Sequence, residues 1–172
     1  MTDGSLSIRP ARPGEASLVF QFVRELAEYE KLEHEVEATE AMIDAALFGE
    51  QPRVFCDIAE WDGEPVGFAV WFLNFSTFSG RPGIYLEDIF VRPAFRGRGV
   101  GKALMVHLAR KCVENGWARL QWSVLDWNTP SIEFYKSLGG VLLDEWTVVR
   151  VSGDALTRQM VHSSLSCAPI DR

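Results

Sequence analysis

Apolar side chains at helical spacing, together with helix-capping and helix-ending residues, predict four helices along the chain. Leu18, Phe22, Leu26 and Tyr29 follow one another at intervals of three and four residues, which predicts a long helix that Pro13 opens and that ends near residue 31. Three further helices are expected: "EAMIDAALFG", which Thr39 can cap and Gly49 can end, a segment from about Gly99 to Asn115-Gly116, and "SIEFYKSL", which stops at Gly139-Gly140.

Runs rich in β-branched and aromatic residues lie between these helices and predict strands. They cover residues 6–11, 53–61, 65–75, 83–91 and 118–125, and "VLLDEWTVVRV" and "ALTRQMV" close the chain as a strand pair around "SGD". The "DGE" turn after the second run indicates a hairpin. The predicted order is β-αα-βββ-α-β-α-ββ. It corresponds to an α/β (α+β) fold, with a mixed, mostly antiparallel sheet of about seven strands and helices on both faces.

Length and composition fit one globular domain. Of the 172 residues, 47% are hydrophobic and 24% are charged, so we expect a single domain over 1–172, with its core in about 6–162 and a frayed C-terminal tail. The net charge of −7 argues against a partner that is a nucleic acid or an anionic membrane, because such binding needs clustered Lys and Arg.

Other composition signals point to a cytoplasmic protein without a metal. The start "MTDGSLSIRPA" lacks the charged and apolar regions of a signal peptide, and the apolar runs are shorter than the ~20 residues of a spanning helix. The three cysteines form no CxxC pair and are expected as reduced thiols, with Cys56 and Cys112 in the core. The three histidines are scattered, so no metal site is expected.

A glycine-rich segment, "RGRGVG" at residues 96–101, joins a predicted strand to a predicted helix. Unpaired N–H groups and the positive end of the helix dipole favour an anion at such a junction. A Rossmann fingerprint would need glycine where Lys102 stands, and a Walker A loop would need glycine at Arg96 and Ser or Thr at Ala103. The remaining pattern is R-x-x-G-x-G. Taken alone, it is also compatible with a turn that binds no ligand.

Two longer segments, "YLEDIFVRPAFRGRG" and "NTPSIEFYKSLG", accompany this loop about thirty residues apart. Together with the loop, they resemble the GCN5-related N-acetyltransferases, and the order of elements from residue 6 to residue 161 is similar to theirs. The segment "RELAEYEKLEHEV" further resembles the diamine (spermidine/spermine) and thialysine acetyltransferases within that family. The resemblance implies acetyl-CoA as cosubstrate, a small-molecule amine as the second substrate, and a homodimer.

The resemblance also implies where acetyl-CoA binds. The backbone of the strand around Ile89, Phe90 and Val91 would pair with the pantetheine arm, and the glycine-rich loop would hold the pyrophosphate. Asn128 is expected to bond the pantetheine, to cap the following helix, or to do both. The implied cofactor-binding residues are Ile89, Phe90, Val91, Arg96, Gly97, Arg98, Gly99, Val100, Gly101, Lys102, Asn128, Pro130, Ser131 and Tyr135.

Acetyl transfer to an amine needs a proton acceptor and a proton donor. A primary amine has a pKa near ~10.4 and must lose a proton before it attacks. Glu87 and Asp88 are the candidates, and because they point to opposite faces of a regular strand, only one can face a given substrate. Glu87 matches the family's carboxylate, although an ordinary exposed carboxylate is the alternative. Tyr135 matches the family's general acid for the departing thiolate, the alternative being a core aromatic residue.

The second substrate is expected to be a small polycationic amine. Residues 25–40 contain seven Glu and one Lys, which describes either a solvated face or an acidic rim that attracts cations. By resemblance, Tyr29, Glu30, Glu87 and Asp144 would bind the amine. The loop "TFSGRPG" carries Phe78 where those relatives carry a tryptophan, so a shorter diamine or thialysine is as plausible as spermidine.

These observations predict an acetyl-CoA-dependent N-acetyltransferase that moves the acetyl group directly, since no Ser-His-Asp or Cys-His arrangement is recognisable. Two alternatives remain. One is an acetyltransferase for protein N-termini or lysines, and the other is a non-catalytic acyl-CoA-binding sensor domain.

Overall fold

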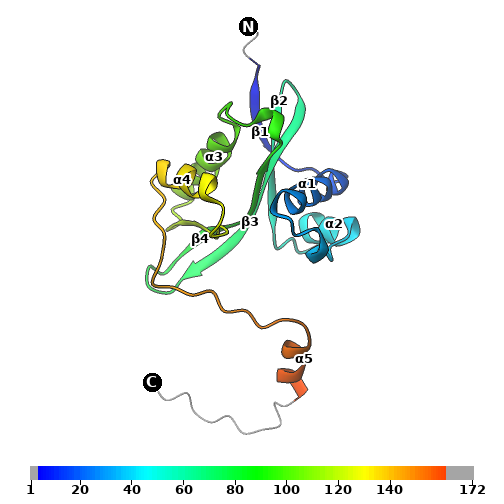
Figure 1. The fold of residues 1–172 in the computed structure, drawn as a ribbon, viewed down its shortest axis with the longest axis vertical. Helices are drawn as coiled ribbons and strands as arrows, with labels where there is room; N and C mark the ends of the chain where they lie inside the picture. Colours follow the sequence, from blue (N-terminus) through cyan, green and yellow to red (C-terminus); the bar gives the residue numbers. More distant parts are fainter. Residues whose placement is uncertain (1–3, 162–172) are drawn as a thin grey trace. The chain divides into compact units, whose positions relative to one another are not determined.

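The computed structural model describes residues 4–161 (Figure 1). The chain divides into two compact units, Met1–Ile132 and Glu133–Arg172. The predicted fraying of the C-terminal tail and the positions of His162 and Cys167 lie outside the described residues. A single domain over the whole chain stays a prediction.

A five-stranded mixed sheet forms the centre of the first unit. Its strands follow one another in sequence order, and all neighbours are antiparallel except the last pair, β4 and β5, which is parallel. The predicted mixed, mostly antiparallel sheet is therefore confirmed for these strands. They are β1 (Leu6–Pro10), β2 (Phe55–Trp61), β3 (Glu64–Ser76), β4 (Arg81–Val91) and β5 (Leu120–Trp122).

Helices cover both faces of this sheet (Figure 1). On one face, α1 (Ala16–Glu30) and α2 (Glu40–Phe48) pack their apolar sides on β2, β3 and β4. On the other face lies α3 (Val100–Glu114), whose buried side includes Leu104 and Leu108. Two short 3-10 helices, η1 (Glu33–Glu35) and η2 (Pro93–Phe95), follow α1 and β4. The prediction of helices on both faces is confirmed. The segment between β4 and α3 leads from the end of a central strand to the helix on one of these faces.

Several local signals act as the sequence predicts. The Thr39 hydroxyl accepts a hydrogen bond from the Met42 N–H at 3.3 Å and so caps α2, and Gly49 ends that helix. Asp62 and Gly63 join β2 to β3 with φ angles of 52° and 83°, the positive values that a two-residue hairpin turn requires. Cys56 and Cys112 are buried free thiols, and burial raises the pKa of each.

A buried carboxylate holds α3 against the sheet. Asp57 on β2 is 1% exposed, and it accepts a hydrogen bond from the Trp71 indole N–H at 2.8 Å. From α3, His107 Nε2 lies 3.2 Å and Lys111 Nζ lies 3.5 Å from Asp57 Oδ1. The lysine compensates the buried negative charge, because its ammonium group carries the opposite sign.

The end of the chain differs from the prediction of two closing strands. After α4 (Thr129–Ser137), residues 141–151 are exposed and pair with no strand of the described sheet, and the "ALTRQMV" segment is part of a helix, α5 (Gly153–Val161). The described chain therefore has five strands rather than about seven. A β-branched run without a paired neighbour or a buried face forms no stable strand. Ala, Leu, Arg, Gln and Met favour a helix, and Asp154 lies in its first turn.

Candidate active site

The glycine-rich loop ends in the N-terminus of α3, as the sequence predicts. Gly97 and Gly99 have φ angles of 74° and 84°, and a Cβ added at either would meet no atom within 4 Å. The first backbone hydrogen bond of the helix runs from the Ala103 N–H to the Gly99 carbonyl at 2.9 Å, so the preceding N–H groups have no partner within the helix. No acidic residue lies in the first turn. This open, positively polarised end fits a pyrophosphate group.

The second half of β4 presents a free edge. β5 pairs with β4 only from Ile84 to Leu86, whereas β3 pairs with it as far as Val91. On the β5 side, residues 87–91 therefore have no neighbouring strand in the described part of the chain. An extended molecule with amide groups can pair with such an edge as a strand would. The edge leads through η2 into the glycine-rich loop.

The two candidate proton acceptors lie at a β-bulge in β4. Val70 on β3 is opposite Asp88, whereas Trp71 is opposite Leu86, so Glu87 is an extra residue without a partner in the ladder. The assumption of a regular strand is therefore wrong at this point. Because the bulge shifts the alternation by one residue, Asp88 shares the sheet face of Val70 and Phe90, the face that α1 covers. Glu87 is exposed.

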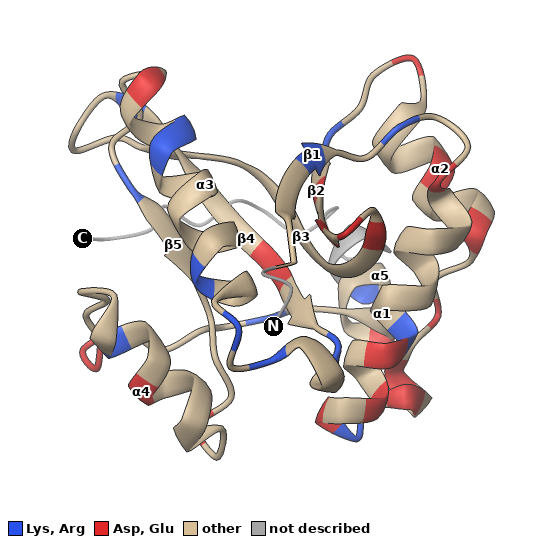
Figure 2. Ribbon diagram, turned by 90° about the horizontal axis from the view of Figure 1, so that it is seen from above, with Lys and Arg blue, Asp and Glu red and all other residues tan. Residues whose placement is uncertain are grey.

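Burial and neighbouring charge perturb the carboxyl groups beside the bulge. Burial first, and then the charges of Glu87 and Glu30, raise the pKa of Asp88 to about 6. Burial also raises the pKa of Glu30 at the C-terminal end of α1. A carboxyl group with a pKa near 6 is well suited to accept and release protons near neutral pH. In Figure 2, the red colour of acidic residues appears in the middle of β4 and at several positions along α1.

Arginine side chains connect the segment after β4 to aromatic rings. The Arg96 guanidinium lies 4.4 Å from the centre of the Tyr29 ring on α1, and its Nε donates to the Val91 carbonyl at 2.8 Å. Arg98, from the same loop, lies instead over Trp61 and Phe95.

A second arginine contact with α1 has no signal in the sequence. Arg92 donates from Nε and Nη2 to the Glu25 carboxylate at 2.9 and 2.8 Å, and its guanidinium lies over Phe22. The partners are 67 positions apart in the chain, which is why no local pattern predicts their pairing.

Asn128 caps α4, one of its two predicted roles. Its side-chain oxygen accepts a hydrogen bond from the Ser131 N–H at 3.4 Å, and its carbonyl accepts one from the Ile132 N–H at 3.0 Å. The Asn128 side chain is buried, whereas Pro130 in the first turn is exposed. The pantetheine contact predicted for Asn128 stays a prediction.

Tyr135 and Asp144 belong to the second unit. The Tyr135 ring lies 5.3 Å from that of Phe134 in α4, and Asp144 is exposed. The structure thus brings together, in the first unit, the bulge, the C-terminal end of α1 and the loop before α3. The participation of Tyr135 and Asp144 in the same site stays a prediction.

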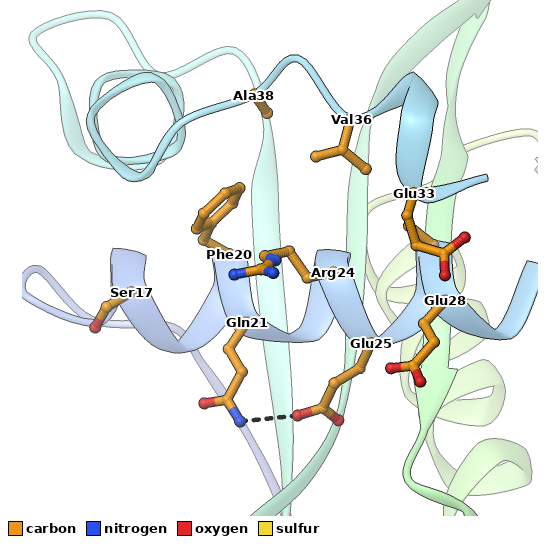
Figure 3. A pocket seen from close by; sticks show the side chains of 10 residues that line it. Ser17, Phe20, Gln21, Arg24, Glu25, Glu28, Glu33, Val36 and Ala38 are labelled. Carbon is orange, nitrogen blue, oxygen red and sulfur yellow. Dashed lines mark hydrogen bonds between the residues drawn. The ribbon is translucent and has the colours of Figure 1, made fainter. Parts of the chain in front are cut away.

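A pocket of about 790 Å³ lies beside α1, on the side that faces the segment 33–38 (Figure 3). Its polar groups come from Ser17, Gln21, Arg24, Glu25, Glu28 and Glu33, and Gln21 donates to Glu25 at 2.8 Å. None of the predicted catalytic or cofactor-binding residues lines this pocket. It is therefore a feature separate from the bulge.

Residues 4–161 lack two features. They contain no cluster of three or more His, Cys, Asp or Glu side chains that could hold a metal ion. No helix in this range has both the length and the apolar character needed to cross a membrane.

Comparisons with known proteins agree with the arrangement of these elements. The sequence model of the acetyltransferase (GNAT) family matches residues 19–139. Thialysine N-epsilon-acetyltransferase of Bos taurus is 39% identical over 160 residues, which cover 87% of this chain and 94% of that protein. L-ornithine N5-acetyltransferase of Arabidopsis thaliana is 28% identical, with 87% and 85% covered. Among solved structures, an integron cassette protein from the mobile metagenome of V. cholerae superposes with a TM-score of 0.76 at 28% identity, covering 91% of this chain and 98% of that one.

Proposed function

Because this chain belongs to the acetyltransferase (GNAT) family of N-acetyltransferases, which use acetyl-CoA, we propose that it acetylates a primary amine of a small polycationic molecule. A diamine, a polyamine or a thialysine-like amino acid fits this description. The observation that carries the proposal is the acidic bulge of β4, which lies between a free strand edge and the C-terminal end of α1.

The free edge and the loop would hold acetyl-CoA. The pantetheine amides would pair with β4 at Ile89 to Val91, and the pyrophosphate would accept hydrogen bonds from the N–H groups at the start of α3. In this arrangement the thioester would lie near Glu87 and Asp88. A backbone N–H directed at the thioester oxygen would stabilise negative charge there in the transition state.

The reaction is a direct transfer. The amine nitrogen attacks the thioester carbonyl carbon, the C–N bond forms, and the C–S bond breaks. Glu87 accepts the first proton of the substrate ammonium group, directly or through water, and later releases it to solvent. The hydroxyl of Tyr135 gives a proton to the departing thiolate, and the nitrogen, which carries one excess proton after the C–N bond forms, returns a proton to the Tyr135 oxygen, so that CoA leaves as a thiol and the amide is neutral. The raised pKa of the neighbouring Asp88 supports a role for this carboxyl pair in proton transfer.

The acidity of α1 supports a cationic substrate. Glu28, Glu30 and Glu33 lie in or just after the last turn of this helix, close in sequence to Tyr29, and their field attracts a molecule with several ammonium groups. In this proposal Tyr29 and Glu30 bind the amine, with Asp144 as a further contact. A homodimer and a cytoplasmic location are further parts of the proposal that rest on resemblance and composition.

The proposal is tested by following thiol release from acetyl-CoA in the presence of diamines, polyamines, thialysine and peptides. We expect turnover with small amines that carry two or more positive charges. Turnover with peptides alone would favour the alternative of a protein acetyltransferase. CoA binding without turnover across the whole panel would favour an acyl-CoA sensor and overturn the proposal.

The general acid is tested with Tyr135→Phe. Removal of one hydroxyl group leaves the ring in place, and we expect kcat to fall about 100-fold, the effect typical of general acid catalysis. CoA affinity, measured by calorimetry, serves as the control and should stay within about twofold of the unchanged protein. Full turnover in this variant would exclude Tyr135 as the acid.

A further inference from the structure

One contact joins the two halves of the candidate site directly. Arg96 opens the glycine-rich loop, and Tyr29 lies at the end of α1, 67 positions earlier in the chain. The guanidinium carbon of Arg96 lies 4.4 Å from the centre of the Tyr29 ring and 5.4 Å from that of Phe90. We propose that Arg96 is a positioning residue that couples the cofactor loop to the amine-binding end of α1, an inference that rests on the proposed function.

The orientation of Arg96 divides its hydrogen-bonding groups. Its guanidinium carbon lies over the Tyr29 ring, and its Nε donates to the Val91 carbonyl at 2.8 Å. Its two terminal amino groups have no hydrogen-bond partner within the described part of the chain. A planar guanidinium can stack through its face and still bind an anion through its edge. Arg96 therefore holds the Tyr29 ring with its face and offers its edge to a phosphate oxygen.

The position of Arg92 explains why Arg96 contacts α1 at its C-terminal end. Phe22, Glu25 and Tyr29 fall on one stripe of α1, and Arg92 is bound to the first two. Arg92 is thus committed to the body of α1 and has three of its nitrogens in hydrogen bonds, the third being Nη1 with the Pro65 carbonyl. Arg96 makes the corresponding contact one turn later, next to Glu30. Arg92 holds α1 in place. Arg96 contacts Tyr29 at the end of this helix, so a change in the conformation of the loop also changes the surroundings of Tyr29.

The consequence is a linkage between the two substrates. When CoA binds the terminal amino groups of Arg96, it immobilises the whole guanidinium group, including the side that contacts Tyr29. The Tyr29 side chain is then ordered before the amine binds. By thermodynamic reciprocity, if CoA raises the affinity for the amine, the amine raises the affinity for CoA by the same factor. A change at Tyr29 is also expected to alter the affinity for CoA, because Arg96 then loses the ring on which its guanidinium lies. A cation–π contact at a partly exposed site corresponds to about a two- to fivefold change in affinity.

The inference is tested by a double-mutant cycle on CoA binding, measured by calorimetry without any amine. We expect Tyr29→Leu to weaken CoA binding about two- to fivefold, and Tyr29→Phe, which keeps the ring, to leave it unchanged. Arg96→Lys keeps the charge but loses the plane and the Nε hydrogen bond. In the Arg96→Lys background, Tyr29→Leu should have no further effect.

Arg98→Met is the matched control. It also removes a guanidinium group from this loop, but one that lies over Trp61 and Phe95 and not over a ring of α1. In this background Tyr29→Leu should keep its full effect on CoA affinity. Equal effects of Tyr29→Leu in the unchanged, Arg96→Lys and Arg98→Met proteins would overturn the inference.

The two proposals fail in different ways. A protein that binds CoA and acetylates amines but shows an additive cycle contradicts the coupling alone. If the cycle is non-additive and no amine is acetylated, the coupling stands and the proposed function falls. A protein that binds no CoA contradicts both.

Discussion

At the scale of single residues, Asp88 is held in a position where burial opposes its charge. The bulge at Glu87 turns Asp88 toward the sheet face that α1 covers, and the charges of Glu87 and Glu30 add to the effect of burial. The result is a pKa of about 6, well above the ordinary value of an aspartate. A group tuned in this way destabilises the fold at neutral pH, which is a cost that proteins accept at functional sites.

We expect Asp88→Asn to stabilise the protein at pH 7 but not at pH 4. The folded-state pKa lies above the unfolded value, so the unchanged protein loses stability as the pH rises from about 4 to beyond 6, and the amide does not. The difference of about two units corresponds to roughly 3 kcal/mol in the free energy of unfolding. Denaturant titrations of both proteins at several pH values measure it.

Glu87→Gln is the comparison variant for this experiment. It removes one of the charges that raise the pKa of Asp88 but leaves the larger effect of burial, so it should stabilise the protein at pH 7 much less than Asp88→Asn does. A stability difference between Asp88→Asn and the unchanged protein that is the same at pH 4 and pH 7 would contradict the assignment of the raised pKa to Asp88.

At the scale of elements, two helices are attached to opposite faces of one sheet by different means. Packing of Phe22 and its neighbours holds α1, together with the Arg92–Glu25 pair, and a buried carboxylate, Asp57, assists in holding α3. The attachment of α3 bears on the proposed function, in which the N-terminus of this helix binds the pyrophosphate of CoA. A helix that shifts by a fraction of a turn no longer directs its first N–H groups at the same point.

Asp57→Ala is expected to destabilise the protein by about 3 kcal/mol, because it leaves the indole N–H of Trp71 and the ammonium group of Lys111 without their buried partner. Urea denaturation measures the free energy of unfolding. Asp44→Ala on the exposed side of α2 is the matched control and should change stability by less than about 0.5 kcal/mol. Equal effects of the two substitutions would show that the Asp57 cluster contributes nothing to the fold.

At the scale of the whole molecule, charge is the property that bears on the substrate. The chain carries a net charge of −7, and seven of its acidic residues lie in the short stretch 25–40. Their field extends over about 10 Å at 0.1 M salt and acts on any cation that approaches this end of α1.

Salt is therefore expected to weaken binding of a polyamine more than binding of a monoamine. Between 0.02 and 0.3 M ionic strength, KM for a diamine should rise about three- to tenfold, while kcat stays nearly constant, because screening acts on the encounter and not on the reaction. Steady-state kinetics with a diamine and with a monoamine of equal length measure the effect. The same salt dependence for both amines would contradict attraction by the acidic field.

The sequence by itself was sufficient for the first four α-helices, the first five strands and the placement of the glycine-rich loop before α3. Apolar periodicity, the cap at Thr39, the Asp62-Gly63 turn and the glycines before α3 are local signals, and their meaning depends on nearby residues alone. The closing strands failed as a prediction for the opposite reason. A strand depends on a partner elsewhere in the chain, and residues 141–151 have none in the described sheet.

The tertiary structure alone decided how the site residues meet. The register shift that turns Asp88 depends on the pairing of β4 with β3, and the stacking of Arg96 on Tyr29 joins residues 67 positions apart. The register shift and the stacking contact cannot be predicted from the spacing of residues in the sequence, because both depend on which surfaces meet when the strands pair and α1 covers the sheet. Local chemistry specifies elements one at a time, whereas contacts between distant elements arise only when burial of the common core brings them together.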